Sequence, residues 1–257
     1  LGGKGANQSI ALAKAGADVR HVGRINESDA NFKQIMIKHN INCKFVACTE
    51  SPSGHAIIQV TPSGENAIVL FGGANHEITA KDVMAALDDV KSNDWVLTQN
   101  ETSAIDEVLK QAKEKGLKVA FNPAPMTESV KQLPVDCIDL LIVNEVEAQE
   151  ISGHSDIDSM EQYFRTHLSH SEIIITLGKA GVCMLKKDRR IEVDAFVVDA
   201  VDTTAAGDTF IGFFLSAYSQ HTDAKSALTR ACAASALAVT QVGAAQSIPD
   251  EEQVNRF

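Results

Sequence analysis

The chain has 257 residues, 44% of them hydrophobic, and a formal net charge of −11, values that suit one large α/β domain. The acidic balance argues against nonspecific binding to nucleic acid or to an acidic membrane, and no apolar run reaches the ~20 residues of a membrane span. The five cysteines are scattered and odd in number, so we expect reduced thiols and a cytoplasmic protein without a disulfide framework or zinc site.

Short β-branched runs alternate with amphipathic helical runs along the chain. We expect strands over residues 20–25, 43–48, 55–61, 66–71, 95–98, 118–121, 138–143, 173–177, 182–186 and 191–193. We expect helices over residues 7–15, 28–39, 80–90, 103–115, 161–169, 209–218 and 224–241, and one that begins at Glu145. A β-prone run over residues 195–198 is expected before the 209–218 helix. This alternation predicts an α/β fold with three layers, in which helices cover both faces of a mostly parallel, doubly wound sheet.

Two of the predicted strands, 55–61 and 66–71, differ from the rest because no helix separates them. Pro62-Ser63-Gly64-Glu65 between them is a favourable turn sequence, so we expect a β-hairpin. A hairpin of this kind is expected to stand apart from a parallel sheet.

The stretch over residues 201–210 reads Val-Asp-Thr-Thr-Ala-Ala-Gly-Asp-Thr-Phe and opens a predicted helix. The small residues Ala205, Ala206 and Gly207 leave backbone N–H groups uncovered at the positive helix end, which suits an anion. Asp208 would repel a resting anion, so we interpret it as a base that takes a proton from a nucleophile. The combination indicates phosphoryl transfer to a hydroxyl. The alternatives are a tight turn that needs small residues and an ordinary carboxylate at a helix N-terminus.

Five segments, in one order along the chain, resemble those of the ribokinase-like carbohydrate kinases. They are Gly-Gly-Lys-Gly-Ala-Asn-Gln at residues 2–8, Asn-Pro-Ala-Pro at 122–125, Asn-Glu-Val-Glu-Ala at 144–148, Thr-Leu-Gly-Lys-Ala-Gly at 176–181 and Asp-Thr-Thr-Ala-Ala-Gly-Asp-Thr-Phe at 202–210. The resemblance implies a single ribokinase-like domain over residues 1–257, with lid strands within about 45–72. It also implies ATP-dependent phosphorylation of D-ribose at its 5-hydroxyl and a homodimer formed through the lid strands.

The resemblance assigns the glycine-rich run near the N-terminus to the sugar. The residues implied in sugar binding are Gly3, Lys4, Gly5, Ala6, Asn7, Glu101 and Asp208. An ammonium and a short amide suit a polyol, and the run is neither a P-loop nor a dinucleotide fingerprint. From the residues alone, Asn7 is better explained as a helix N-cap and Glu101 as a solvated loop acid.

A nucleotide site and a divalent cation are also implied by the resemblance. The implied nucleotide residues are Asn144, Thr176, Leu177, Gly178, Lys179, Ala180, Gly181, Gly207 and Cys232, where members of the family often carry His in place of Cys232. Asn144 and Glu147 are implied to act on Mg²⁺ through water, which this ion retains readily. Spacing alone favours a capping box for this pair. A plain hairpin turn is the alternative over 176–181, and tight helix packing explains the small residues around Cys232 equally well.

A monovalent-cation site is the last feature that the resemblance implies. The implied K⁺ residues are Asp202, Thr204 and Ser247, with backbone carbonyls near Val239, Val242 and Ala244. The cation would organise the anion hole without touching the substrate.

Residue 1 already lies in the loop before the glycine-rich run. In the family, a strand and a lid segment with a sugar-binding Asp precede this point, so we expect an N-terminal segment to be missing from the chain. Three alternatives stay open: a related kinase for fructose, 2-deoxyribose or a nucleoside, a catalytically silent binding protein, and a redox Rossmann enzyme, which would lack its glycine fingerprint.

Overall fold

The computed structural model describes residues 2–60 and 66–257, so the turn expected over 62–65 lies outside the described residues. The helices are α1 (Lys4–Lys14), α2 (Ala30–Lys38), α3 (Ala80–Ala86), α4 (Ile105–Glu114), α5 (Glu145–Ser152), α6 (Ile157–His167), α7 (Ala206–Ser219), α8 (Ala224–Ala238) and α9 (Glu251–Arg256). The strands are β1 (Arg20–Asn26), β2 (Asn42–Thr49), β3 (His55–Val60), β4 (Asn66–Phe71), β5 (Trp95–Gln99), β6 (Lys118–Asn122), β7 (Leu140–Asn144), β8 (Glu172–Thr176), β9 (Val182–Lys186) and β10 (Arg189–Val193).

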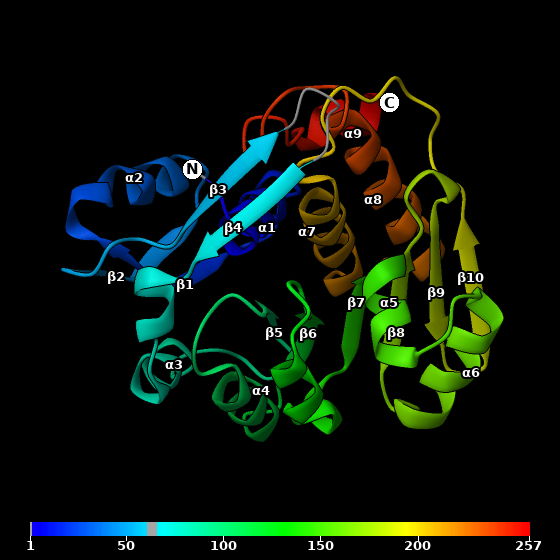
Figure 1. Cartoon of the computed structure of the whole chain (residues 1–257), viewed down its shortest axis with the longest axis horizontal. Coiled ribbons are helices and arrows are strands. Elements are labelled where there is room, and N and C mark those ends of the chain that lie inside the picture. The colour runs from blue at the N-terminus through cyan, green and yellow to red at the C-terminus, as the bar shows by residue number, and fades with distance from the viewer. Residues whose placement is uncertain (1, 61–65) are drawn as a thin grey trace.

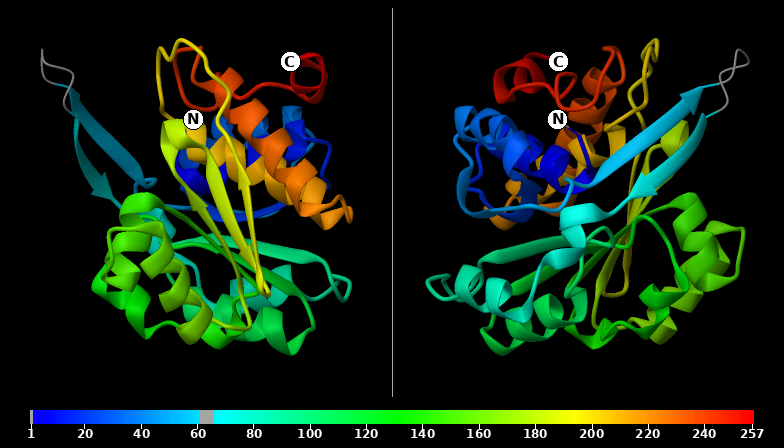
Figure 2. Two further views of the ribbon diagram at one scale, coloured as in Figure 1. Left: turned by 90° about the vertical axis from the view of Figure 1, so that its right-hand side faces the viewer. Right: turned by 60° about the vertical axis from the view of Figure 1, so that its left-hand side comes forward.

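The main sheet has six strands in the order β10-β9-β8-β7-β6-β5. Strands β5 to β8 are parallel, whereas β9 and β10 are antiparallel to their neighbours. A second, two-stranded sheet is formed by the parallel strands β1 and β2. Helices lie on both faces of the main sheet (Figures 1 and 2), which confirms the predicted three-layer, mostly parallel α/β fold.

Alternate residues of the central strands pack into opposite helical layers. Ile142 of β7 and Ile174 of β8 belong to the core that includes α1, α7 and α8. Their sequence neighbours Leu141 and Ile173 belong to the other core, against α3 to α6. Since successive side chains of a strand point to opposite faces, one apolar run supplies both cores. This explains why the strand runs are continuously apolar.

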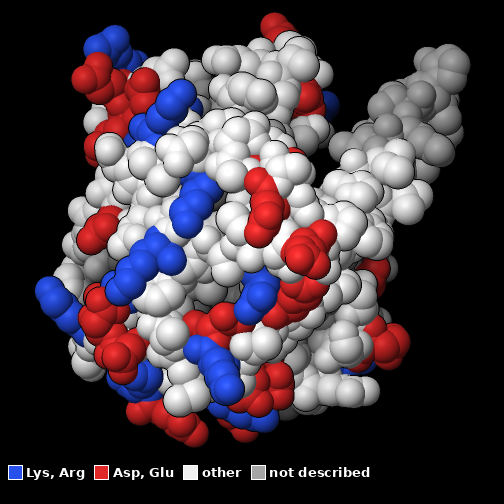
Figure 3. All heavy atoms as spheres, turned by 90° about the vertical axis from the view of Figure 1, so that its left-hand side faces the viewer, with Lys and Arg blue, Asp and Glu red and all other residues white. Residues whose placement is uncertain are grey.

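Strands β3 and β4 form the predicted antiparallel hairpin, in which Ile57 lies opposite Val69. This hairpin, hereafter the arm, projects from the body in Figures 2 and 3. Its exposed side chains include Ile57, Val69, Leu70 and Phe71. Charged groups of both signs cover the body in Figure 3, whereas the described part of the arm carries none in that view.

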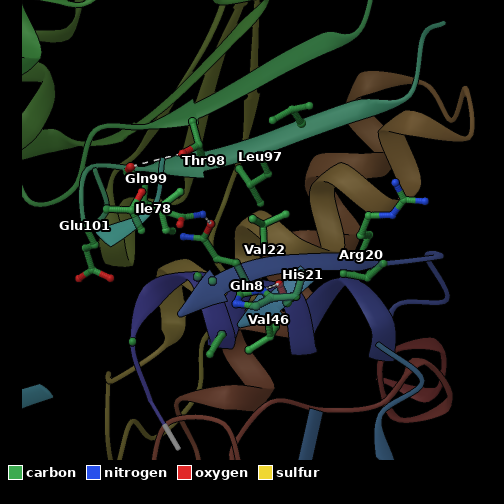
Figure 4. A pocket seen from close by; sticks show the side chains of 18 of the residues that line it. Gln8, Arg20, His21, Val22, Val46, Ile78, Leu97, Thr98, Gln99 and Glu101 are labelled. Atoms are coloured by element: carbon green, nitrogen blue, oxygen red, sulfur yellow. Dashed lines mark hydrogen bonds between the residues drawn. The ribbon is translucent and has the colours of Figure 1, made fainter. Parts of the chain in front are cut away.

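A groove of about 1130 Å³ separates the two sheets, with consecutive residues of β1 and β5 along its walls. Each of these strands pairs on one side only, β1 with β2 and β5 with β6, so their free edges face each other. In Figure 4, Leu97 of β5 and Val22 of β1 point into this space, and Glu101 lies at the end where the strands terminate. The carboxyl ends of the strands therefore open toward one end of the groove.

Two local predictions need correction, and one helix was not predicted. Residues 195–198 form no strand, because no backbone hydrogen bond within the described residues joins them to a neighbouring strand, and Val197 is fully exposed. Helix α1 begins at Lys4 with Gly3 as its N-cap, so Asn7 lies inside the helix and is not the cap. Helix α9, which is closed by a capping box at Asp250, was not predicted. In the described part of the chain, no helix is both long and apolar enough to cross a membrane.

Candidate active site

The candidate site includes the N-terminus of α7. Ala205, the residue before the helix, has a φ of 63°, a left-handed conformation that turns the chain sharply into Ala206. The helix has 14 residues and no side-chain cap. The N–H of Ala206 donates to the carbonyl of Thr203 at 3.2 Å, whereas no hydrogen bond within the described residues uses the N–H groups of Gly207 and Asp208, which remain available for an anion. An added Cβ on Gly207 would meet no atom within 4 Å, so the space above this turn is open. The local structure thus agrees with an anion site at residues 205–207.

Asp208 lies in this first turn and is only 8% exposed. Its carboxylate accepts hydrogen bonds from Nδ2 of Asn7 at 2.9 Å and from Nε2 of Gln8 at 2.9 Å, both on α1. The two amide donors and the positive end of α7 stabilise the charged carboxylate. A buried, oriented carboxylate beside an open anion site is able to take a proton from a bound hydroxyl.

Gln8 continues from Asp208 into a chain of buried and half-buried amides that the sequence prediction missed. Its Nε2 also donates to Oδ1 of Asn122 at 3.3 Å, and its Oε1 accepts from Nε2 of Gln99 at 2.6 Å. Gln8 and Asn122 stand in two of the family-like segments and Gln99 ends β5, yet no role was predicted for them. For Gln99 and Asn122, a polar residue at the end of an apolar strand was the available signal.

Lys4 links the expected sugar residues with the expected metal residues. Its backbone N–H donates to Oε2 of Glu101 at 3.2 Å. Burial raises the pKa of Glu101, and the Lys4 ammonium opposes this rise while the Asp208 charge adds to it. Burial likewise raises the pKa of Glu147, opposed first by the hydrogen bond from the backbone N of Asn144 and then by the Lys4 ammonium. One ammonium therefore acts on both carboxyl groups at this end of the sheet.

Asn7 carries an unused acceptor in the same place. The residue is 4% exposed, and its Oδ1 has no hydrogen-bond partner within the described residues. Buried polar atoms are nearly always hydrogen-bonded, so this oxygen calls for a ligand donor such as a hydroxyl. Gly3, with a φ of 90°, and its neighbour Gly2 leave open space beside the start of α1.

Asn144 and Glu147 form the capping box that their spacing indicated. Oδ1 of Asn144 accepts from the backbone N of Glu147 at 2.8 Å, and Oε2 of Glu147 accepts from the backbone N of Asn144 at 2.9 Å. Asn144 ends β7 and lies directly beside Thr176 of β8. The 176–181 segment turns back into β9, as the backbone N–H of Leu177 donates to the carbonyl of Gly181 at 2.8 Å. The capping and turn explanations are therefore correct locally, and they leave Oε1 of Glu147 outside the cap.

The residues expected around K⁺ come together in two adjoining loops. The Asp202 carboxylate accepts from the backbone N of Thr204 and of Gly243, each at 2.9 Å. The Val239 carbonyl accepts from two backbone N–H groups, and the Ala244 carbonyl accepts from both N and Oγ of Ser247. The set consists of oxygen atoms, which fits a hard cation. A carbonyl has two lone pairs, so a cation bound to Val239 or Ala244 would share or replace these bonds.

Cys232 lies in the core between α8 and the sheet and is 8% exposed. Burial raises the pKa of its thiol to about 11, which keeps it protonated at neutral pH. Among the described residues, no hydrogen bond joins its thiol to the 176–181 turn. Over residues 2–60 and 66–257, no group of three His, Cys, Asp or Glu side chains is placed to hold a metal ion.

Known proteins are similar to this chain in sequence and in fold over nearly its full length. The sequence model for the pfkB family carbohydrate kinases matches residues 1–251. The ribokinase of Staphylococcus aureus is 35% identical over 99% of this chain and 87% of its own length. The deoxyribokinase of Salmonella typhi is 31% identical over 100% of this chain and 87% of its own length.

The solved structure of Arabidopsis thaliana ribokinase complexed with ribose and ATP has the same fold. It superposes with a TM-score of 0.87 at 29% identity, over 99% of this chain and 86% of that protein. With the family match covering residues 1–251, this chain belongs to the pfkB family of carbohydrate kinases.

Proposed function

We propose that the protein transfers the γ-phosphoryl group of ATP to the 5-hydroxyl of D-ribose, giving ribose 5-phosphate and ADP. The observation that carries the proposal is Asp208, a buried carboxylate held by two amides in the uncapped first turn of α7. A base and an anion site that adjoin in one helical turn suit transfer from a phosphate to an alcohol. The relatives named for ribose support the choice of sugar.

In the proposed reaction, Asp208 takes the proton of the sugar hydroxyl as its oxygen bonds to the γ-phosphorus and the bond to the β-phosphate oxygen breaks. The backbone N–H groups at Ala205, Ala206 and Gly207 stabilise the charge of the transferring group. Lys4, Asn7 and Glu101 hold the sugar, and the free Oδ1 of Asn7 accepts one of its hydroxyls.

Two cations complete the proposal. Asn144 and Glu147 would hold Mg²⁺ through water, and Mg²⁺ would supply charge neutralisation of the phosphates. Asp202, Thr204 and Ser247, with the carbonyls of the adjoining loop, would hold K⁺ beside the anion site. The absence of a carboxylate cage among the described residues favours a divalent ion that arrives with the nucleotide.

The nucleotide is proposed to lie along the carboxyl edge of β7 and β8. Asn144 and Thr176 are adjacent there, and the open turn over 176–181 leads from β8 to β9. The α8 face around Cys232 is the proposed adenine side. We also propose cytoplasmic location, since ATP is the donor and the five cysteines are free.

The second candidate acceptor is 2-deoxyribose. The deoxyribokinase relative is 31% identical over 100% of this chain, compared with 35% for the Staphylococcus aureus ribokinase. The two sugars differ in one hydroxyl, whereas the reacting 5-hydroxyl and the Asp208 turn serve both. Fructose and nucleosides stay open for the same mechanistic reason.

The test is ADP release from Mg·ATP with ribose, 2-deoxyribose, fructose or a nucleoside, each in K⁺ buffer and in Na⁺-only buffer. We expect release that depends on sugar, is strongest with ribose and is faster with K⁺. Preference for another sugar would overturn the ribose assignment. Equal rates in the two buffers would overturn the K⁺ site. Release that no acceptor stimulates would contradict the kinase proposal.

A further inference from the structure

The amide chain behind Asp208 has a defined direction. The carbonyl of Ile142 can only accept, and Nδ2 of Asn122 donates to it at 3.0 Å. Oδ1 of Asn122 therefore faces Gln8, whose Nε2 donates to it and to Oδ1 of Asp208. The main-chain carbonyl of β7 thus fixes which side of each amide faces the next.

Gln99 fixes the orientation of the Gln8 amide at its oxygen atom. Its Nε2 donates to Oε1 of Gln8 at 2.6 Å, so every polar atom of the Gln8 amide has a partner. Turning the Gln8 amide over would place its oxygen against the oxygens of Asp208 and Asn122. Gln8 is 0% exposed, so water is unable to compensate for such a turn.

We propose that Gln8 is a positioning residue that holds the Asp208 carboxylate for proton abstraction, and that Asn122 and Gln99 orient Gln8. This inference rests on the proposed function, and it adds residues from α1, β5 and β6 to the reaction. The competing explanation is that the amides only satisfy one another inside a packed core.

Gln8→Met tests the role of the amide, because methionine keeps the side-chain length and removes both donors. The steady-state rate is measured per bound nucleotide, counted by calorimetry, so that unfolded protein does not enter kcat. We expect kcat to fall on the order of 10- to 100-fold, because a bond to a charged group is lost, with the KM values for ribose and ATP nearly unchanged.

Ser216→Ala is the matched control. Oγ of Ser216 donates to the carbonyl of Ala15 at 2.9 Å, a buried bond that also joins α7 to α1 but lies away from Asp208. We expect this variant to lower the unfolding temperature and to leave kcat per bound nucleotide unchanged. A comparable kcat loss in the control would assign the Gln8 effect to helix packing and overturn the inference.

Gln99→Glu tests orientation, because a carboxylate only accepts and would face Oε1 of Gln8. We expect a large loss of kcat in the single variant. In the double variant Gln8→Met/Gln99→Glu, we expect kcat to be close to that of Gln8→Met alone. The Gln99→Glu change should then add little, because no Gln8 amide remains to be turned. Strictly additive losses would mean a through-space charge effect and would overturn the orienting role.

The outcomes separate this inference from the kinase proposal. Unsubstituted protein that releases no ADP with any sugar contradicts the proposed function. Active unsubstituted protein with wild-type kcat in Gln8→Met leaves the kinase proposal intact and overturns the positioning role.

Discussion

At Glu101, burial and two neighbouring charges act on one carboxyl group. Burial raises its pKa, the Lys4 ammonium opposes the rise, and Asp208 adds to it. The folded state therefore holds this proton more tightly than the unfolded chain. Below the unfolded value of about 4.3, both states are protonated and the group has no effect on stability. As the pH rises through the folded-state pKa, the charged form destabilises the fold.

Glu101→Gln should therefore raise the unfolding temperature at pH 7 to 8, because glutamine resembles the protonated acid. The gain should fade as the pH is lowered toward about 4. Thermal unfolding followed by circular dichroism across this pH range measures it. The same variant should raise the KM for ribose, since the sugar loses a charged acceptor. A temperature difference that is constant with pH would show that the burial of this charge is not the cause.

At the scale of one helix, α7 serves catalysis at its first turn and packing in its middle. Gly207 faces open space, whereas an added Cβ on Gly212 would lie 2.3 Å from Cβ of Ala11 and 2.7 Å from N of Leu12. The backbones of α1 and α7 approach closely at Gly212, and this contact brings Asn7 and Gln8 to Asp208. Two glycines of one helix therefore have separate physical roles.

The same substitution at the two glycines should give opposite results. Gly212→Ala should lower the free energy of unfolding, because overpacking of about 1–3 kcal/mol exceeds the gain in helix propensity of at most about 1 kcal/mol. Gly207→Ala should leave stability unchanged or slightly higher, yet lower kcat by about 10²-fold, since the methyl group enters the path of the phosphoryl group. Urea unfolding and steady-state ADP release measure both. A stable Gly212→Ala or a fully active Gly207→Ala would contradict this division.

The elements themselves were predictable, and the amide chain was not. Alternating β-branched and amphipathic runs predicted the parallel strands because local sequence decides them. The run over 195–198 failed because β propensity without a partner edge makes no strand. Gln8 meets Asp208 across 200 positions of sequence, and Asn122 across 114, so only the packing of α1 on α7 and β6 brings them together. The role of Asp208 was inferred from a carboxylate at a predicted helix start and from the resemblance, and that of Asn7 from the resemblance alone. Neither source gives the distance between the two side chains.

At the scale of the whole molecule, the arm exposes apolar side chains that the body does not cover. Ile57 and Val69 lie opposite each other in the hairpin and are 55% and 58% exposed. An apolar, uncharged strand pair that projects into solvent is typical of a contact surface. We propose that two copies pair through their arms, as expected for a homodimer.

Val69→Lys should convert the proposed dimer to monomer, because burial of an unpaired ammonium in the contact is unfavourable. Sedimentation velocity at micromolar concentration measures the change. Met84→Lys is the control, since Met84 is 57% exposed on α3 and lies outside the arm. A dimer that survives Val69→Lys would refute pairing through the arm, and a monomeric unsubstituted protein would refute the dimer.

The most direct measurement is the single-turnover rate of ADP formation by Asp208→Asn with ribose, Mg·ATP and K⁺, beside the unsubstituted protein. Asparagine keeps the shape of the side chain and removes the base, so we expect the rate to fall on the order of 10²- to 10⁴-fold while the protein stays folded and binds ribose. A folded Asp208→Asn protein that turns over at a near-normal rate would contradict the role of Asp208 as the base.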